Sequence, residues 1–330
     1  ELVQLAPQIL GASFEMVDAV SGTACAATAS ATPGAPNTSR EAGGAQAAPT
    51  VLQADNPFQT VAQVKQEYVV VRDAAAQIPA LFHILETERR NLPQDHKIIV
   101  FFVTARLTQL FAELFNAMQI PTLEIHSRQS QGARQRASDA FHDGKGVTMF
   151  SSDVTARGMD YPDVSLVVQV GIPSNAEQYI HRLGRTARAG KSGRGVLILM
   201  QDETLFLRQV QNLPLKDATA SLPATTPELT SRLTRGMSLL GPDIKSQGYA
   251  AWLGYYNSSK VPWSKERLVA AANEFAMTAF YLPSPPAIPK KTIGKMGLKG
   301  VKGLVAEVEP AQHHHQGNGG RGGGQPFRRQ

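Results

Sequence analysis

Cysteine is nearly absent from this chain of 330 residues, since Cys25 is the only one. One cysteine cannot form a disulfide within the chain or build a zinc site from several thiolates, and we predict no metal site in this chain. Long apolar runs are also absent. None approaches the roughly 20 residues that a helix needs to cross a bilayer, so we expect no contact with a membrane.

A start methionine is missing as well, because the chain begins at Glu1, and no signal-like segment follows it. We therefore expect a processed chain or a fragment, with any targeting segment outside these residues. Acidic residues are in the minority: 33 Lys and Arg against 27 Asp and Glu leave a net charge of +6. That balance favours a polyanionic partner, although ordinary solvated charge accounts for it equally well.

Short apolar runs alternate with helical patterns through residues 58–203. The run KIIVFFVT at 97–104 is continuously apolar, as in a strand buried on both faces, and apolar residues then recur at helical spacing up to Met118. We predict strands at 64–71, 97–104, 122–126, 146–152, 164–171 and 195–200. With helices between most of them, this pattern predicts an α/β fold built on a doubly wound parallel sheet.

The segments before this region predict no independent domain. Residues 1–20 have the pattern of a short helix and a strand, which are too few to bury a core alone. They resemble the end of something larger. Residues 21–57 consist mainly of small residues, Pro and Gly, which is typical of a flexible linker.

The segments after it are of two kinds. Residues 204–282 show helical periodicity without strand alternation and predict a small helical extension, in which Thr226 and Ser264 are the expected helix N-caps. Residues 283–330 are rich in Pro, Gly and basic residues and predict a disordered cationic tail. Such a tail either binds nucleic acid without sequence preference or only keeps the chain soluble.

The stretch HRLGRTARAG at 181–190 predicts an anion site. If the preceding helix continues through it, His181, Arg185 and Arg188 share one helix face. Two guanidinium groups on one face, close to glycines, suit an oxyanion such as phosphate. The alternative is an exposed basic helix without a ligand.

The stretch SSDVTARGMDYPDV at 151–164 supports the anion site. It follows a predicted strand, so Ser152 and Asp153 would lie at the carboxyl edge of the sheet, where such sheets bind ligands. Gly158 would allow close approach of the backbone, and Asp160 could accept a hydrogen bond from a sugar hydroxyl. Arg157 either meets an anion or forms a structural ion pair with its acidic neighbours.

These two stretches, in this order and spacing, resemble motifs V and VI of the DEAD-box RNA helicases. KIIVFFVTA at 97–105 resembles motif IV, and QGAR at 131–134 resembles motif IVa. The resemblance implies a RecA-like second helicase lobe over 58–203. In more detail the chain is similar to fungal mitochondrial DEAD-box proteins that act as RNA chaperones in splicing, which also carry a helical extension and a basic tail.

The resemblance assigns roles by position. Arg185 and Arg188 would act on the γ-phosphate of ATP as arginine fingers, with Asp160 at the ribose and Gly158 beside it. His181 and Arg182 would couple the site to the other lobe. Contacts to the RNA backbone, without sequence preference, would come from Thr104, Gln131, Arg134, Ser152, Asp153, Arg157 and Gly158.

The remainder of an ATP site is not recognisable in these residues. The sequence contains no G-x-x-x-x-G-K-[ST] phosphate loop and no D-E-A-D. We expect those motifs, with the Mg²⁺ ligands, in a first lobe before residue 1, and we predict that this chain alone does not hydrolyse ATP. The resemblance further implies a monomeric, mitochondrial RNA helicase. Two alternatives stay open at this point, a non-catalytic RNA-binding module and a lobe of a DNA helicase.

Overall fold

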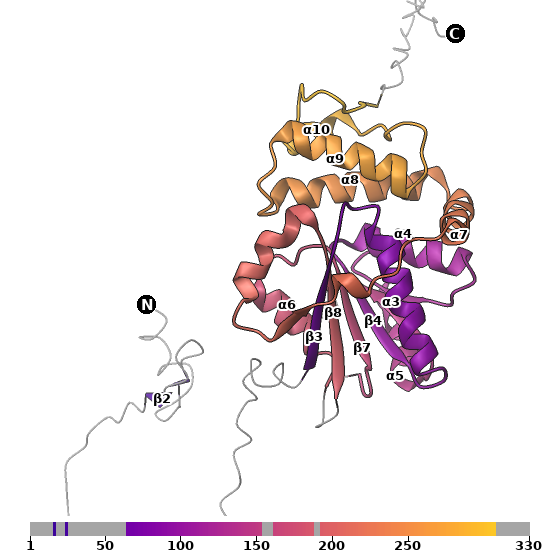
Figure 1. Ribbon diagram of the computed structural model, residues 1–330. Helices are drawn as coiled ribbons and strands as arrows, with labels where there is room; N and C mark the ends of the chain where they lie inside the picture. Colours follow the sequence, from indigo (N-terminus) through magenta and orange to yellow (C-terminus); the bar gives the residue numbers. More distant parts are fainter. Residues whose placement is uncertain (1–15, 18–23, 26–63, 154–160, 188–191, 308–330) are drawn as a thin grey trace, which may run out of the picture. The chain divides into compact units, whose positions relative to one another are not determined.

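The computed structural model describes residues 16–17, 24–25, 64–153, 161–187 and 192–307 (Figure 1). The chain divides into two units, Glu1–Val51 and Leu52–Gln330. In the first unit, β1 (Met16–Val17) pairs antiparallel with β2 (Ala24–Cys25). β2 lies in the segment 21–57, whose assignment as a linker stays a prediction. Backbone pairing does not need large side chains, so composition alone did not indicate this strand.

The second unit is built on a seven-stranded sheet with the strand order β5-β6-β4-β7-β8-β3-β9. Every strand pair in it is parallel. The strands are β3 (Val64–Val71), β4 (Lys97–Phe102), β5 (Leu123–Ile125), β6 (Val147–Ser151), β7 (Leu166–Val170), β8 (Gly193–Met200) and β9 (Leu215–Asp217). The predicted α/β fold with a parallel sheet is confirmed.

Strand β4 shows why both faces of the sheet need covering helices. All six of its residues are buried. Phe102 stacks on Phe111, with ring centroids 5.2 Å apart, in the larger core cluster. Phe101, on the opposite face, belongs to a second cluster with Phe141. Alternate side chains therefore enter two separate cores, as the continuous apolar run predicted.

Four helices cover these faces, and three begin with the side chain that a helix N-terminus requires. They are α3 (Gln77–Asn91), α4 (Ala105–Ala117), α5 (Gln131–Asp143) and α6 (Ala176–Leu183). Thr104, Ser130 and Asn175 each precede a helix and accept a hydrogen bond from a backbone N–H in its first turn. These caps fix where the chain turns away from the sheet edge.

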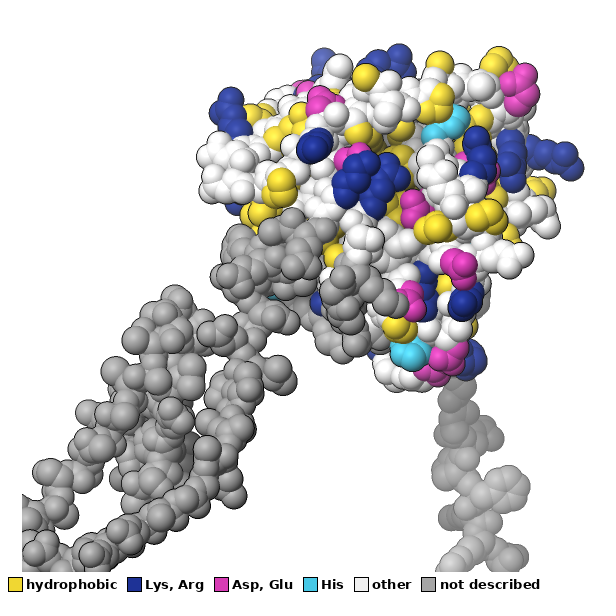
Figure 2. Space-filling view, turned by 60° about the horizontal axis from the view of Figure 1, so that its bottom comes forward, with side chains coloured by type: hydrophobic (Ala, Val, Ile, Leu, Met, Phe, Trp, Pro, Cys, Tyr) yellow, Lys and Arg dark blue, Asp and Glu magenta, His cyan; other side chains and the backbone are white. Residues whose placement is uncertain are grey.

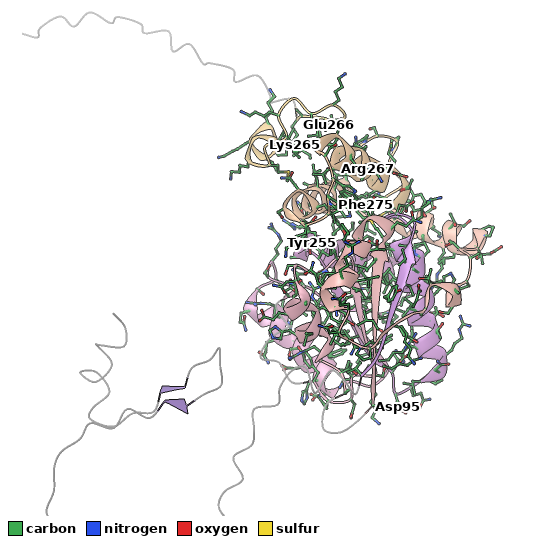
Figure 3. The ribbon with its side chains drawn as sticks, turned by 60° about the vertical axis from the view of Figure 1, so that its left-hand side comes forward. Asp95, Tyr255, Lys265, Glu266, Arg267 and Phe275 are labelled. Carbon is green, nitrogen blue, oxygen red and sulfur yellow. The ribbon has the colours of Figure 1, made fainter. Side chains whose placement is uncertain are left out.

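The extension stacks on the sheet domain as a further layer (Figure 1). It contains two 3₁₀ helices, η2 (Gln201–Val210) and η3 (Thr219–Ser221), and α7 (Pro227–Ser238), α8 (Pro242–Ser258) and α9 (Lys265–Ala279). The predicted N-caps Thr226 and Ser264 are confirmed. Tyr255 of α8 lies at the junction with the sheet domain, far from Asp95 near the opposite end (Figure 3).

The junction is organised around Glu203, a fully buried carboxylate of η2. It accepts hydrogen bonds from the backbone N–H groups of Met200 and Ile172, at 2.7 Å each, and from the hydroxyl of Tyr256, also at 2.7 Å. Gln77 adds a fourth bond at 3.2 Å. Since Met200 ends β8 and Ile172 follows β7, α8 sits against the carboxyl ends of these strands.

Strand β9 corrects the prediction for residues 204–282, which were expected to be purely helical. β9 adds to the edge strand β3, with Gln66 opposite Leu215. Its three residues are too short for an alternating pattern, and only Leu215 is partly buried. A strand of this length is stabilised by the edge it pairs with, which the local sequence does not reveal.

The predicted start of the disordered tail at residue 283 is also corrected, because the folded part of the chain does not end at residue 282. Residues 283–307 remain packed on the extension and include α10 (Lys290–Lys295). Ile288 and Leu298 are almost completely buried. A backbone N–H of Ile288 donates to the carbonyl of Val305 at 2.8 Å. The sequence here is polar on average, and its few apolar residues supply the core contacts. The rest of the predicted tail, 308–330, lies outside the described residues.

Two surface findings complete the fold. None of the described helices is long and apolar enough to cross a membrane. On the face shown in Figure 2, Lys and Arg side chains form separate groups with Asp and Glu side chains between them. On that face the charge is therefore not gathered in a single basic patch.

Candidate functional site

Thr104 stands at the carboxyl end of β4 and begins α4. Its hydroxyl oxygen accepts a hydrogen bond from the backbone N–H of Leu107 at 3.2 Å. Its carbonyl accepts from the hydroxyl of Thr108 at 3.0 Å. A hydroxyl that accepts in this way still has its own hydrogen to donate. Thr104 can therefore cap the helix and donate to a ligand oxygen at the same time.

Gln131 and Arg134 lie in the first turn of α5. Gln131 is exposed, and Ser130 before it caps the helix by accepting from the N–H of Ala133 at 3.3 Å. The side chain of Arg134 is half-buried, and its Nε is buried without a hydrogen-bond acceptor among the described residues. A buried guanidinium N–H needs an acceptor, so this geometry suits an anion placed over the start of α5.

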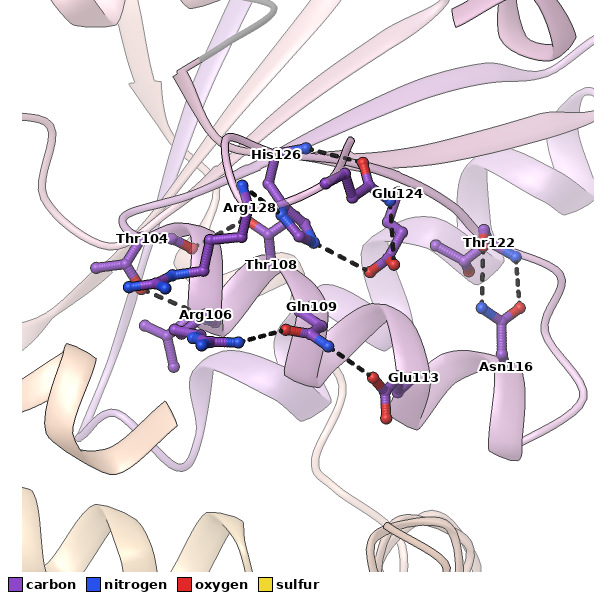
Figure 4. Close-up of polar contacts among 12 residues, drawn as sticks. Thr104, Arg106, Thr108, Gln109, Glu113, Asn116, Thr122, Glu124, His126 and Arg128 are labelled. Atoms are coloured by element: carbon purple, nitrogen blue, oxygen red, sulfur yellow. Dashed lines mark hydrogen bonds and ion pairs between the residues drawn. The ribbon is translucent and has the colours of Figure 1, made fainter. Parts of the chain in front are cut away.

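Arg106 and Arg128 were missed by sequence reasoning. Figure 4 shows their side chains converging beside Thr104. Burial, and then the charge of Arg128, lower the pKa of the Arg106 guanidinium. Arg106 donates to the neutral amide oxygen of Gln109 at 3.1 Å. Two neighbouring cations without a carboxylate between them form a candidate site for an anion. The sequence did contain a signal for them. Each arginine comes two residues after the last residue of a predicted strand, Thr104 for the strand 97–104 and His126 for the strand 122–126.

His126 supports the backbone that carries Arg128. It is buried, and its Nδ1 accepts from the backbone N–H of Arg128 at 3.2 Å. Its Nε2 lies 3.7 Å from a carboxylate oxygen of Glu124. The amide of Gln129 accepts from the N–H of His126 and donates to Glu124, at 3.2 Å each. This network (Figure 4) fixes the turn that leads into α5.

Ser152 and Asp153 follow β6, as predicted, and Asp153 has partners within its own lobe. Its carboxylate accepts from the Nε of Arg182 at 2.8 Å and from the side chain of Gln178 at 2.9 Å. Ser152 is buried, and its backbone N–H donates to the carbonyl of Ile125 at 3.2 Å. Both residues therefore tie the edge of the sheet together, while their RNA contacts stay predictions.

Arg182 is completely buried, so its contacts are with residues inside this lobe. Its guanidinium lies 2.7 Å from Asp153 and 5.4 Å from the centroid of the Phe101 ring. His181, one residue earlier, is partly exposed and lies 3.8 Å from Glu177. Of the two predicted coupling residues, His181 is thus at the surface, whereas Arg182 holds α6 against β6 and β4.

Arg185 follows the carboxyl end of α6 and lines a cavity of about 140 Å³ with Tyr161, Asp163 and Ser192. Its Nε donates to the carbonyl of His181 at 3.3 Å. Burial raises the pKa of Tyr161, and the nearby charge of Arg185 works against that rise. A cavity of this size is smaller than the 300–1,000 Å³ of typical small-molecule sites, so it can hold part of a nucleotide at most.

The predicted site residues divide between the two edges of the sheet. Thr104 and Ser152 lie at the carboxyl edge. Asp163 and Ser192 precede β7 and β8 and so mark the amino edge, where Arg185 joins them. Because α6 returns antiparallel to the strands, its last turn is carried to that edge. Four further predicted residues, Arg157, Gly158, Asp160 and Arg188, lie outside the described residues.

The Mg²⁺ ligands were expected in a first lobe, and their location stays a prediction. In the part of the chain that the structure describes, no group of three His, Cys, Asp or Glu side chains gathers in a geometry that would hold an ion. The described residues therefore fit one side of a phosphate site through Arg185, and they do not fit a Mg²⁺ centre of their own.

Comparisons with known proteins agree with these elements. Residues 77–190 match the family model of the helicase conserved C-terminal domain. Over 226 residues the chain is 48% identical to DEAD-box ATP-dependent RNA helicase 26 of Arabidopsis thaliana, covering 68% of this chain and 26% of that protein. It is 42% identical over 253 residues to the mitochondrial ATP-dependent RNA helicase MSS116 of Phaeosphaeria nodorum, covering 76% of this chain and 46% of that protein.

The fold has a solved counterpart. Domain 2 of the DEAD-box helicase Mss116p, in a structure bound to an RNA duplex, aligns with a TM-score of 0.63 at 24% identity. The alignment covers 74% of this chain and 99% of that one. The chain spans less than half the length of the two curated relatives. It belongs to the DEAD-box RNA helicase family, of which it contains the C-terminal, RecA-like lobe with its helical extension.

Proposed function

We propose that the chain is the C-terminal portion of an ATP-dependent RNA helicase that acts as an RNA chaperone. The observation that supports this most is the carboxyl edge of the sheet, where Arg106 and Arg128 lie near Thr104 (Figure 4). Arg134 adds a third cation in the first turn of α5. Its relatives are DEAD-box ATP-dependent RNA helicases by name. One strand of RNA would lie across this edge, held by phosphate and sugar contacts without reading of the bases.

The second part of the proposal concerns ATP. Arg185 and Arg188 would neutralise the charge that develops on the γ-phosphate during transfer, when a first lobe closes over them. When bound, Mg²⁺ would supply the neutralisation of the phosphate oxygens from that lobe. Asp160 would contact the ribose. Tyr161 and Asp163 line the cavity with Arg185 on this side.

Strand separation follows from combining the two edges in one rigid lobe. RNA held at the carboxyl edge and ATP held at the other both favour closure against the first lobe. Closure on one bent strand would expel its partner, and loss of phosphate after hydrolysis would reopen the cleft. His181 at the surface would meet the other lobe, while Arg182 acts on α6 from within. We further propose that the protein works in mitochondria, the compartment named for the fungal MSS116 relatives. We also propose that it acts as a monomer and assists RNA splicing.

RNA binding at the carboxyl edge is tested with a charge-matched pair of variants. Arg106→Glu with Arg128→Glu should weaken binding of a short single-stranded RNA at least about tenfold. It should also reduce the slope of log affinity against log salt by about 1.4, since each lost single-strand contact removes about 0.7. Fluorescence anisotropy over a salt series measures both.

The control carries the same charge change elsewhere. Arg208→Glu with Arg235→Glu alters two exposed arginines outside the proposed site and should leave the salt slope nearly unchanged. Equal losses in the two double variants would contradict a localised RNA site. A clear preference for DNA over RNA of equal length would instead favour a DNA helicase lobe.

A further inference from the structure

A groove of about 940 Å³ lies at α10 and the turns after it, on the side of α9 that faces away from the sheet (Figure 1). Gly300 and Gly303 shape it with φ angles of +77° and +95°, a region that favours glycine. It is remote from both edges of the sheet, and the RNA and ATP sites do not use it.

The rim of the groove carries one sign of charge. Five lysines line it, Lys290, Lys291, Lys295, Lys299 and Lys302, and all five are exposed. No aspartate or glutamate is among the lining residues. Five ammonium groups around one concavity repel each other, and an anionic occupant would relieve that repulsion.

The floor of the groove is aliphatic. Ile293 and Leu298 are buried at its base, and Val301 and Leu304 are only half-buried. The two half-buried side chains leave apolar surface in contact with water inside the groove. An occupant that covers them gains about 25 cal/mol for each Å² removed from water. The groove therefore favours an occupant that is apolar on one side and anionic on the other.

This combination distinguishes between classes of macromolecule. Grooves that take up the bases of single-stranded RNA commonly stack them on aromatic side chains, and no aromatic residue lines this groove. Phosphates would use the lysines and leave the aliphatic floor uncovered. A membrane surface is broad and flat, whereas this site is concave. An amphipathic helix places apolar side chains at i, i+3, i+4 and i+7 into such a groove and points its acidic residues at the rim.

The chain's own C-terminal segment has the wrong charge for the groove. Residues 308–330 contain three arginines and one glutamate. Lysine side chains also lay their methylene stems along apolar surface, so they can cover the flanks of a bound helix. We propose that this groove docks an acidic, amphipathic peptide segment of a partner protein.

The test uses the whole chain and a synthetic probe. The probe is a fluorescent peptide of about 15 residues, with leucines on one helical face and glutamates elsewhere. A scrambled peptide of the same composition and a single-stranded RNA of similar charge serve as comparisons. We expect micromolar, salt-sensitive binding of the amphipathic peptide, and binding at least about tenfold weaker for the scrambled one.

Variants locate the binding. Lys295→Glu with Lys299→Glu should reduce peptide affinity at least about tenfold, whereas Lys145→Glu with Lys216→Glu, a distant pair of equal charge change, should not. Val301→Thr keeps the shape of the floor, adds a polar group and should also weaken binding, with an unchanged thermal unfolding midpoint showing that the fold is kept.

Three outcomes would overturn the proposal. They are equal binding of the scrambled peptide, peptide binding that survives the rim variant, and loss of RNA binding alone from the rim variant. The last would make the groove an RNA site. If Val301→Thr unfolds the chain, Leu304→Met tests the floor by shape, and it should change peptide affinity without changing RNA affinity.

Discussion

At the scale of single residues, Thr104 combines a structural and a proposed binding role in one hydroxyl. Thr104→Ala removes the helix cap and should lower the free energy of unfolding by about 1 kcal/mol. Thr104→Asp keeps a cap of equal quality but places a negative charge where phosphate is expected. Both variants should lose RNA affinity, and only the alanine variant should lose stability.

Urea unfolding and RNA titration of the same two proteins check this separation. Wild-type RNA affinity in Thr104→Asp would show that the hydroxyl faces no phosphate. A loss of stability in both variants would instead contradict the cap geometry.

The titration of Glu203 should make the free energy of unfolding depend on pH, and the burial of this carboxyl decides the direction of the change. Burial raises its pKa to about 7 from the ordinary 4.5, against hydrogen bonds from Met200, Tyr256 and Ile172 that favour the ionised form. A carboxyl whose pKa is raised by folding contributes stability fully below its unfolded pKa and loses it as pH rises through the folded value. The window therefore runs from about pH 4.5 to somewhat above 7.

Glu203→Gln removes this titration. The wild type should lose up to about 3 kcal/mol of unfolding free energy across that window relative to the variant, since one pKa unit equals about 1.4 kcal/mol. Because the variant also disturbs four hydrogen bonds, it should be less stable at low pH, and the gap should narrow as pH rises. Chemical denaturation at a series of pH values measures the gap, and a gap that stays constant would contradict the raised pKa.

At the scale of elements, the chain after α9 should matter for stability. Ending the chain at residue 282 removes Ile288, Ile293 and Leu298 from the core, each worth about 1.5–3 kcal/mol when buried. It also removes carbonyls that accept from the side chains of Lys265 and Asn273. A chain ending at 282 should unfold several degrees lower than one ending at 307.

The chain ending at 307 is the matched control, and it should keep the thermal midpoint of the full chain. Calorimetry of the three lengths makes the comparison. Equal midpoints for the chains ending at 282 and 307 would show that residues 283–307 add nothing to the core.

The elements also show which features of this chain are readable in its sequence. β4 and α4 were predicted within a few residues, because a strand buried on both faces and a helix with one apolar face have periodicities of their own. β9 was missed because its pairing with β3 decides its conformation. Arg106 and Arg128 were missed because they are 22 residues apart in sequence, and only the parallel sheet brings the ends of β4 and β5 together.

At the scale of the whole molecule, the proposed RNA site and the proposed ATP site lie at opposite edges of the sheet. One short helix, α6, connects the two edges. α6 begins after β7 at the carboxyl edge and ends at the amino edge, where Arg185 projects. Asp153 and Arg182 fasten that helix to the edge where RNA is proposed to bind. The proposed RNA binding at one edge and the proposed phosphate contact at the other would therefore be carried by one packed unit. The remaining half of the catalytic site would belong to the first lobe.

The ATP site is tested most directly by RNA-stimulated ATP hydrolysis of the complete protein carrying Arg185→Ala. The control variant is Arg208→Ala, which changes an exposed arginine outside the proposed sites. We predict a fall of about 10³-fold or more in turnover for Arg185→Ala, as expected for an arginine finger, with nucleotide-free RNA binding nearly unchanged. Arg208→Ala should retain normal turnover. Wild-type turnover in Arg185→Ala would contradict the assignment of this lobe's amino edge to ATP.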